Sequence, residues 1–236
     1  AHHLVAIPLL EAGLDVLCEK PLGVTLKAGR KIIEAAEAGG RVLATAEDIR
    51  RFLPARACLW ALTEEKLLGD LHTGTVQLFQ YGPFDYTNPT FKWRGIRTLT
   101  GGGMLLDSGA HFADMCLCLF GDLQHAYCTL SALDRRTIED APVVGTAAAD
   151  VEDTWHAVLT FKSGVTVEWS YSRSLPGANI RTAVYYGDNG AIEDLGFPFH
   201  CFQNGGKITM RDGSTLSADD LQKRYLETLS PRRKRT

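Results

Sequence analysis

Two short apolar runs separated by one amphipathic segment are the feature that most constrains the fold of this chain. Residues 15–18 and 41–46 each have the length and composition of a short buried strand. Between them, Thr25 can cap a helix that extends to Ala38 and stops at Gly39-Gly40. A strand, a helix and a second strand in this order are typical of a parallel, doubly wound sheet. The side chains predicted to face inward from this helix are Leu26, Ile32, Ile33 and Ala36.

The pattern changes after Gly69, where strands begin to outnumber helices. Turn sequences such as Lys162-Ser-Gly164 lie between apolar runs and indicate antiparallel hairpins. We therefore predict an α/β domain over residues 1–48 and an α+β domain over residues 49–236. The second domain is predicted to contain helices at 49–68 and 104–120, an irregular segment at 82–97, and strands at 73–81, 126–134, 153–161, 165–172 and 181–186.

Charge and cysteine usage exclude several classes of protein. The formal net charge of -3 argues against a general nucleic-acid binder and against a membrane-surface binder. No apolar run approaches the roughly 20 residues that span a bilayer. The six cysteines are scattered without a Cys-x-x-Cys pair, which is typical of reduced thiols in a cytoplasmic protein rather than of a disulfide framework or a zinc site.

A carboxylate and an imidazole stand four residues apart after a glycine turn. Asp107 and His111 follow Gly101-Gly-Gly103 at the start of a predicted helix, so both are expected on one helix face. An imidazole oriented in this way can take a proton near neutral pH. The alternative is structural: Asp107 caps the helix, and His111 is a core histidine paired with it.

Other residues could complete such a site. Lys20, at the end of the first predicted strand, offers a cation that can stabilise a developing alkoxide, or is simply a solvated lysine. Glu19 could contact a cofactor or cap backbone amides. Trp93-Arg94 offers an aromatic wall and a planar donor, or anchors a surface loop. We predict no metal site, because Asp107, His111 and Asp114, although at helical spacing, lack the further sulfur or imidazole ligands that zinc prefers.

Several motifs occur in a fixed order along the chain. Val16-Leu-Cys-Glu-Lys-Pro21 precedes Trp93-Arg94, which precedes Gly101-Gly-Gly-Met-Leu-Leu-Asp107-Ser-Gly-Ala-His111-Phe-Ala-Asp114. Val151-Glu-Asp153 then stands before a strand. In this order the motifs resemble those of the Gfo/Idh/MocA family of NAD(P)-dependent oxidoreductases.

The resemblance implies a Rossmann sheet followed by an open, mainly antiparallel sheet flanked by helices. It implies hydride transfer between NAD or NADP and a hydroxyl-bearing carbon of a sugar, cyclitol or related polyol. Lys20, Asp107 and His111 then correspond to the catalytic residues, and Glu19, Lys20, Trp93 and Arg94 to cofactor contacts. It also implies a homo-oligomer, a dimer or tetramer, commonly formed through the exposed face of the sheet.

One expected motif is missing from the chain. A dinucleotide-binding fold needs a Gly-x-Gly-x-x-Gly turn between its first strand and helix, and no such sequence occurs. We therefore expect a fragment that begins at the fourth or fifth strand of the Rossmann sheet. Two alternatives stay open: a relative that cleaves a glycosidic bond by transient oxidation with retained NAD, or a catalytically dead dimerising scaffold.

Overall fold

The computed structural model describes residues 2–47, 51–196 and 201–230. The chain divides into two compact units, each assembled from three separate stretches. Unit 1 comprises residues 1–47, 82–110 and 130–154, and unit 2 comprises residues 48–81, 111–129 and 155–236. The domain boundary predicted near residue 48 coincides with the position where the chain first leaves unit 1 and enters unit 2. The division into two sequential domains stays a prediction.

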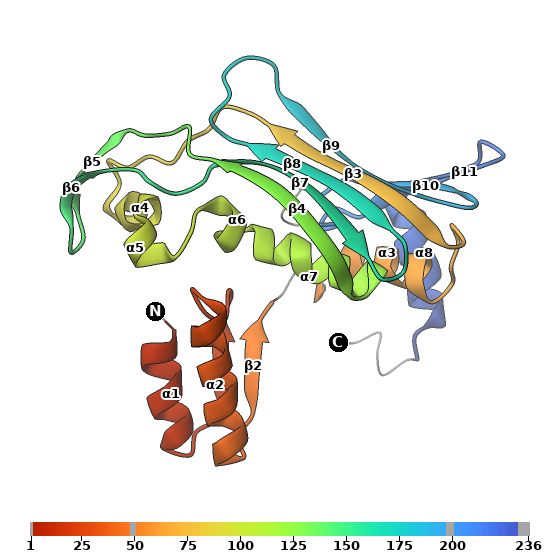
Figure 1. The fold of residues 1–236 in the computed structure, drawn as a ribbon. Helices are drawn as coiled ribbons and strands as arrows, with labels where there is room; N and C mark the ends of the chain where they lie inside the picture. The colour runs from red at the N-terminus through yellow and green to blue at the C-terminus, as the bar shows by residue number, and fades with distance from the viewer. Residues whose placement is uncertain (1, 48–50, 197–200, 231–236) are drawn as a thin grey trace. The chain divides into compact units, whose positions relative to one another are not determined.

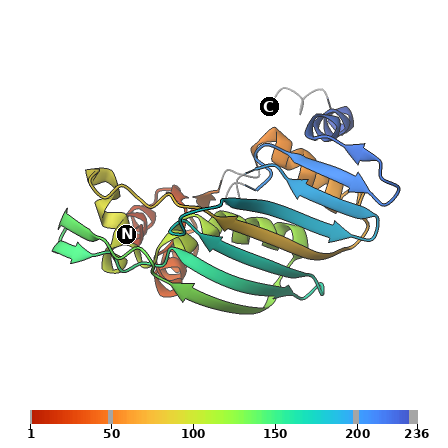
Figure 2. The same ribbon diagram turned by 90° about the horizontal axis from the view of Figure 1, so that it is seen from above.

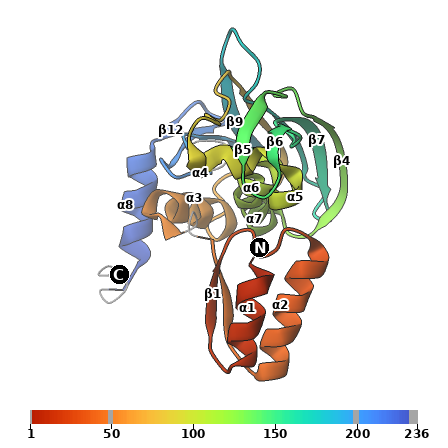
Figure 3. The ribbon, with the colours of Figure 1, turned by 90° about the vertical axis from the view of Figure 1, so that its left-hand side faces the viewer.

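Unit 1 begins with two helices beside a two-stranded parallel sheet (Figures 1 and 3). The elements are α1 (His3–Glu11), β1 (Val16–Glu19), α2 (Leu26–Gly39) and β2 (Leu43–Ala46). The Thr25 hydroxyl accepts the Ala28 N–H at 3.1 Å, and Gly40 ends α2 with a φ of 58°. The strand–helix–strand prediction and the Thr25 cap are therefore confirmed, and α2 ends at Gly39, one residue beyond the predicted end at Ala38.

The buried face of α2 includes fewer of the predicted side chains than expected. Ile32 and Ala36 of α2 are buried against α1, as expected. The prediction was wrong for Leu26 and Ile33, which are 81% and 43% exposed. The physical reason is that Ile32 and Ala36 form one row at i and i+4, whereas Ile33 lies about 100° further round the helix.

The two strands are also less buried than expected. In β1 Cys18 is buried, but Leu17 is 70% exposed, and Val42 beside β2 is 64% exposed. A helix layer can cover only one face of a two-stranded sheet, so the alternate side chains stay at the surface.

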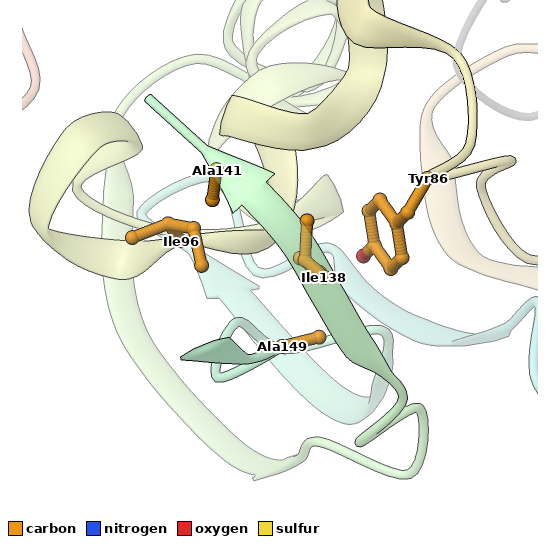
Figure 4. Close-up of a cluster of buried hydrophobic side chains, with 5 residues drawn as sticks. All are labelled: Tyr86, Ile96, Ile138, Ala141 and Ala149. Atoms are coloured by element: carbon orange, nitrogen blue, oxygen red, sulfur yellow. The ribbon is translucent and has the colours of Figure 1, made fainter. Parts of the chain in front are cut away.

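The segment from residue 82 to 110 folds into single helical turns. These are α4 (Pro89–Lys92), the 3-10 turn η2 (Trp93–Gly95), α5 (Arg97–Thr100) and α6 (Met104–Asp107). Tyr86 and Ile96 of this segment pack on the hairpin of β5 (Thr137–Ala141) and β6 (Gly145–Ala148) in a buried cluster (Figure 4). The cluster consists of Tyr86, Ile96, Ile138, Ala141 and Ala149.

The predicted helix over residues 104–120 is interrupted. It forms α6 and then α7 (Gly109–Phe120), with Ser108 between them. At the interruption the carbonyl of Asp107 accepts a hydrogen bond from Lys20 Nζ at 2.6 Å. Asp107 and His111 therefore do not share one continuous helix, which corrects that prediction, and they fall in different units.

Unit 2 is built on an open eight-stranded sheet (Figure 2). Its strand order is β12-β11-β10-β9-β3-β8-β7-β4. β3 pairs parallel with β8 and antiparallel with β9, and the β9–β10, β10–β11 and β11–β12 pairs are antiparallel. The strands are β3 (Leu71–Phe79), β4 (Leu123–Ser131), β7 (Thr154–Phe161), β8 (Thr166–Ser172), β9 (Ile180–Gly187), β10 (Gly190–Asp194), β11 (Gly206–Met210) and β12 (Thr215–Leu216).

Helices α3 (Leu53–Thr63), α7 and α8 (Ala218–Thr228) lie on one face of this sheet (Figure 1). Alternate strand residues point to that face, and among them Trp155 stacks on Tyr171 at 4.2 Å between ring centroids. Phe112 of α7 packs on Trp169 at 4.3 Å. An open, mainly antiparallel sheet flanked by helices is thus confirmed. Helix α3 is shorter than the helix predicted over residues 49–68, of which residues 49 and 50 lie outside the described part.

No helix among the described residues is both long and apolar enough to cross a bilayer.

A buried carboxylate closes the end of β10. Asp194 is 7% exposed, and its Oδ1 accepts the N–H groups of Gly196 and Phe202 at 2.7 and 2.8 Å. Its Oδ2 is buried and has no hydrogen-bond partner among the described residues. Burial raises the pKa of Asp194 to about 7, against the opposing effect of those two backbone N–H groups and of Arg181.

We predict that this carboxyl makes stability fall as pH rises. Between its ordinary pKa and about 7 the folded state keeps the proton of Asp194 and the unfolded state has lost it. Asp194→Asn keeps an acceptor for both backbone N–H groups but does not titrate. From about pH 5 to about pH 7 the wild type should lose about 2–3 kcal/mol of unfolding free energy relative to this variant. Urea unfolding of both proteins measures this, and parallel pH profiles would contradict it.

Candidate active site

Lys20 is held at the carboxyl end of β1 by Asp107. Its Nζ donates to the Asp107 carbonyl at 2.6 Å and to Asp107 Oδ1 at 3.0 Å, across 87 residues of sequence. The Lys20–Pro21 peptide bond is cis. The two side chains are 20% and 33% exposed, so the pair lies at the edge of solvent rather than in bulk water. The prediction that Lys20 and Asp107 come together is thereby realised within unit 1.

Arg94 contacts the same carboxylate from the other side. Its Nη1 donates to Asp107 Oδ2. Its guanidinium lies 5.1 Å from the Trp93 ring centroid and 5.8 Å from those of Phe84 and Phe91. The Arg94 Nε is buried and has no hydrogen-bond partner among the described residues. Asp107 therefore bridges two cations, one of which is packed among aromatic rings.

This geometry assigns Asp107 a role different from helix capping. Both of its carboxylate oxygens accept hydrogen bonds from cations, and its carbonyl accepts a third. A carboxylate engaged in this way fixes the position of an ammonium group. Lys20 Nζ has three donor positions, and the described contacts use two of them.

A cavity of about 380 Å³ opens beside this pair, entirely within unit 1. It has the size of a small-molecule site. Five of the six predicted site residues line it: Glu19, Lys20, Trp93, Arg94 and Asp107. Apolar side chains such as Val24, Leu99 and Met104 form much of the remaining wall.

Glu19 and Trp93 each had a structural alternative to a role in the site. Glu19 Oε2 accepts the N–H of Lys20 at 3.2 Å, which is the backbone contact foreseen as its structural role. Trp93 is 41% exposed, so it is not the buried anchor of a surface loop. Both side chains still border the cavity.

His111 is buried near the start of α7. It is the third residue of α7, is 9% exposed, and belongs to unit 2. Its neighbour Phe112 packs into the core of that unit. The catalytic role of His111 stays a prediction.

Glycines 101–103 form a closely packed turn. A Cβ at Gly101 would lie 2.7 Å from the Val24 carbonyl oxygen, and one at Gly103 would lie 2.0 Å from the Glu152 carbonyl oxygen. The turn is thus packed closely on its own chain, which explains why glycine stands at positions 101 and 103.

Sequence reasoning missed Glu152 as a contributor to the site. Its Oε1 accepts the Gly103 N–H at 2.6 Å, and its carbonyl accepts the Met104 N–H at 3.2 Å. The only signal in the sequence was the pair Glu152-Asp153 before a strand, which gives no partner 49 residues away.

The described residues include no group of three or more His, Cys, Asp or Glu side chains that could hold a metal ion.

Comparison with known proteins identifies relatives. Levoglucosan dehydrogenase of Pseudarthrobacter phenanthrenivorans is 27% identical over 203 residues, which are 81% of this chain and 52% of that protein. Bovine (Bos taurus) trans-1,2-dihydrobenzene-1,2-diol dehydrogenase is 31% identical over 179 residues, which are 75% of this chain and 47% of that protein. The chain thus spans about half the length of these curated relatives.

A solved structure shares the fold. Levoglucosan dehydrogenase in complex with NADH and levoglucosan aligns with a TM-score of 0.74 and 24% identity, over 91% of this chain and 57% of that one.

Two family models match the chain and confirm the predicted family. The GFO/IDH/MocA C-terminal domain matches residues 58–193, and the oxidoreductase family model with NAD-binding Rossmann fold matches residues 1–47. Since the first match alone covers more than half of the sequence, the chain belongs to the GFO/IDH/MocA family of oxidoreductases.

Proposed function

We propose that this chain belongs to a nicotinamide-dependent dehydrogenase and carries catalytic residues of that enzyme. The enzyme acts on a hydroxyl-bearing carbon of a sugar, cyclitol or related polyol. The observation that carries the proposal is the ammonium of Lys20, held by Asp107 at the wall of a cavity. The relatives support it, because two of them are named as dehydrogenases of levoglucosan and of a dihydrodiol.

The cavity residues fit the nicotinamide end of NAD or NADP. Trp93 offers a flat apolar wall, and Lys20, Arg94 and Glu19 offer polar groups for ribose or amide. The buried Nε of Arg94 lacks a partner among the described residues, which favours a bound acceptor nearby. The cofactor, when bound, supplies the hydride acceptor. We keep both NAD and NADP as candidates.

The chain's own residues then prepare the hydroxyl group. Lys20 uses its remaining N–H to donate to the reacting oxygen and favours the developing alkoxide. Asp107 fixes Lys20 in position through its carbonyl and Oδ1. We assign the hydroxyl proton to the imidazole of His111, four residues beyond Asp107 in the motif.

The proposal extends to assembly and location. The sheet of unit 2 leaves Val158 and Tyr186 42% and 47% exposed, which supports a homo-oligomer, a dimer or tetramer. Scattered cysteines without a Cys-x-x-Cys pair support a cytoplasmic location.

The Lys20→Met variant should lose the electrostatic contribution to the reaction. We expect kcat/KM for polyol oxidation to fall about 10²–10³-fold, because an aligned cation at a developing alkoxide contributes that much. Nicotinamide reduction, followed by absorbance over a panel of sugars and cyclitols, measures it. Lys31→Met is the matched control, since Lys31 is exposed on α2. Equal rates for Lys20→Met and the wild type would contradict the role of Lys20.

The His111→Ala variant tests the proton acceptor separately. We expect kcat to fall about 10²–10⁴-fold, the usual contribution of general base catalysis. Nicotinamide binding, titrated by fluorescence, should stay unchanged. His72→Ala is the control, since His72 is exposed and paired with Asp188 in unit 2. Normal turnover by His111→Ala would remove this residue from the mechanism.

A further inference from the structure

We propose that Glu152 is a positioning residue that fixes Asp107 and, through it, Lys20. The kinetic part of this inference rests on the proposed function, whereas the geometric part does not. All the residues that carry it belong to unit 1.

The segment around Glu152 is tied down at both ends. We call residues 149–153 the strap. Ala149 is buried in the cluster shown in Figure 4, and the Asp150 N–H donates to the Gly95 carbonyl at 3.0 Å. At the other end, Asp153 accepts the N–H groups of Leu133 and Asp134 at 3.2 and 2.6 Å. The strap therefore holds Glu152 at a defined place.

Glu152 replaces the missing cap of α6. The residue before α6 is Gly103, which has no side chain to accept the first N–H groups of the helix. Glu152 Oε1 accepts the Gly103 N–H at 2.6 Å, and the Glu152 carbonyl accepts the Met104 N–H at 3.2 Å. Only glycine fits at position 103, because a Cβ would meet that carbonyl oxygen at 2.0 Å.

The contact is transmitted to the catalytic pair through one helical turn. The Gly103 carbonyl accepts the Asp107 N–H at 3.0 Å. The carbonyl and Oδ1 of Asp107 then hold Lys20 Nζ at 2.6 and 3.0 Å. Because α6 is only one turn long, a shift of Gly103 moves the backbone of Asp107 with it.

The carboxylate of Glu152 is buried. Its side chain is 6% exposed, and burying a charge is unfavourable unless hydrogen bonds compensate. Its Oε2 forms an ion pair with Arg97 Nη2 at 3.6 Å, longer than a normal hydrogen bond. Its Oε1 makes the shorter contact, to the Gly103 N–H at 2.6 Å, which joins the carboxylate to the start of α6.

The test compares two substitutions of nearly equal size. Glu152→Met fills the site but offers no acceptor, and Glu152→Gln restores the acceptor without the charge. Glu139→Met is the matched control, since Glu139 is exposed on β5. For each full chain, the readouts are hydrogen exchange of the amides of residues 103, 104 and 107, and kcat and KM for polyol oxidation.

In Glu152→Met we expect exchange at Gly103 and Asp107 to accelerate about tenfold or more. We expect kcat and kcat/KM to fall together about 10²-fold, because a misplaced catalytic group loses that much, with KM unchanged. Glu152→Gln should stay within about fivefold of the wild type. A merely structural role would lower stability and leave kcat unchanged.

Two results would overturn the proposal. One is unchanged exchange at Asp107 and unchanged kcat in Glu152→Met. The other is a Glu152→Gln variant as impaired as Glu152→Met, which would assign the effect to charge. If no form of the chain oxidises a polyol, the proposed function fails, and amide exchange decides the positioning claim alone. If Glu152→Met does not fold, Glu152→Ala, which also offers no acceptor, decides it: exchange at Gly103 and Asp107 faster than in the wild type supports the proposal, and equal rates overturn it.

Discussion

The carboxylate of Asp107 organises the candidate site, because it joins segments that are distant in sequence. It accepts hydrogen bonds from Lys20, at the end of β1, and from Arg94, in the 3-10 turn η2. Without the carboxylate, two cations would face one cavity with no opposite charge between them. The position of the ammonium toward a substrate therefore depends on this residue.

The surroundings of Asp107 explain why unit 1 is assembled from three stretches of chain. The first stretch supplies Lys20, the second supplies Arg94 and α6, and the third supplies the strap with Glu152. The contacts of Lys20 with Asp107 and of Glu152 with Gly103 cross 87 and 49 residues of sequence, so loop closure has to be compensated by packing. The buried cluster of Tyr86, Ile96, Ile138, Ala141 and Ala149 provides packing between the second and third stretches.

Local sequence signals predicted much of the fold. The Thr25 cap, the Gly40 stop and the strand–helix–strand order follow from neighbouring residues, and all are present. The exposure of Leu26 and Ile33 could not be predicted in this way, because it depends on how wide a stripe of α2 meets α1. The interruption at Ser108 could not be predicted either. It coincides with a hydrogen bond from Lys20 to the Asp107 carbonyl, and the hydrophobic periodicity of residues 104–120 carries no information about a partner outside that segment.

In the candidate site, too, the features that depend on contacts between distant residues could not be predicted from local sequence. Five of the predicted residues line one cavity. They could be predicted because the order of their motifs indicated a known family, whereas local spacing did not show their contacts. Glu152 escaped prediction because its partner is a backbone N–H, which has no residue-specific signal. A glycine at position 103 is explained only when the Glu152 carbonyl is seen beside it.

Transfer of a labelled hydrogen is the most direct test of the central claim. A polyol deuterated at its carbinol carbons is incubated with this chain and oxidised nicotinamide cofactor, and the reduced cofactor is analysed by mass spectrometry. We expect one deuterium on the cofactor for each polyol oxidised, and a marked loss of transfer in Lys20→Met. No deuterium on the cofactor, from a folded chain presented with a broad polyol panel, would contradict it.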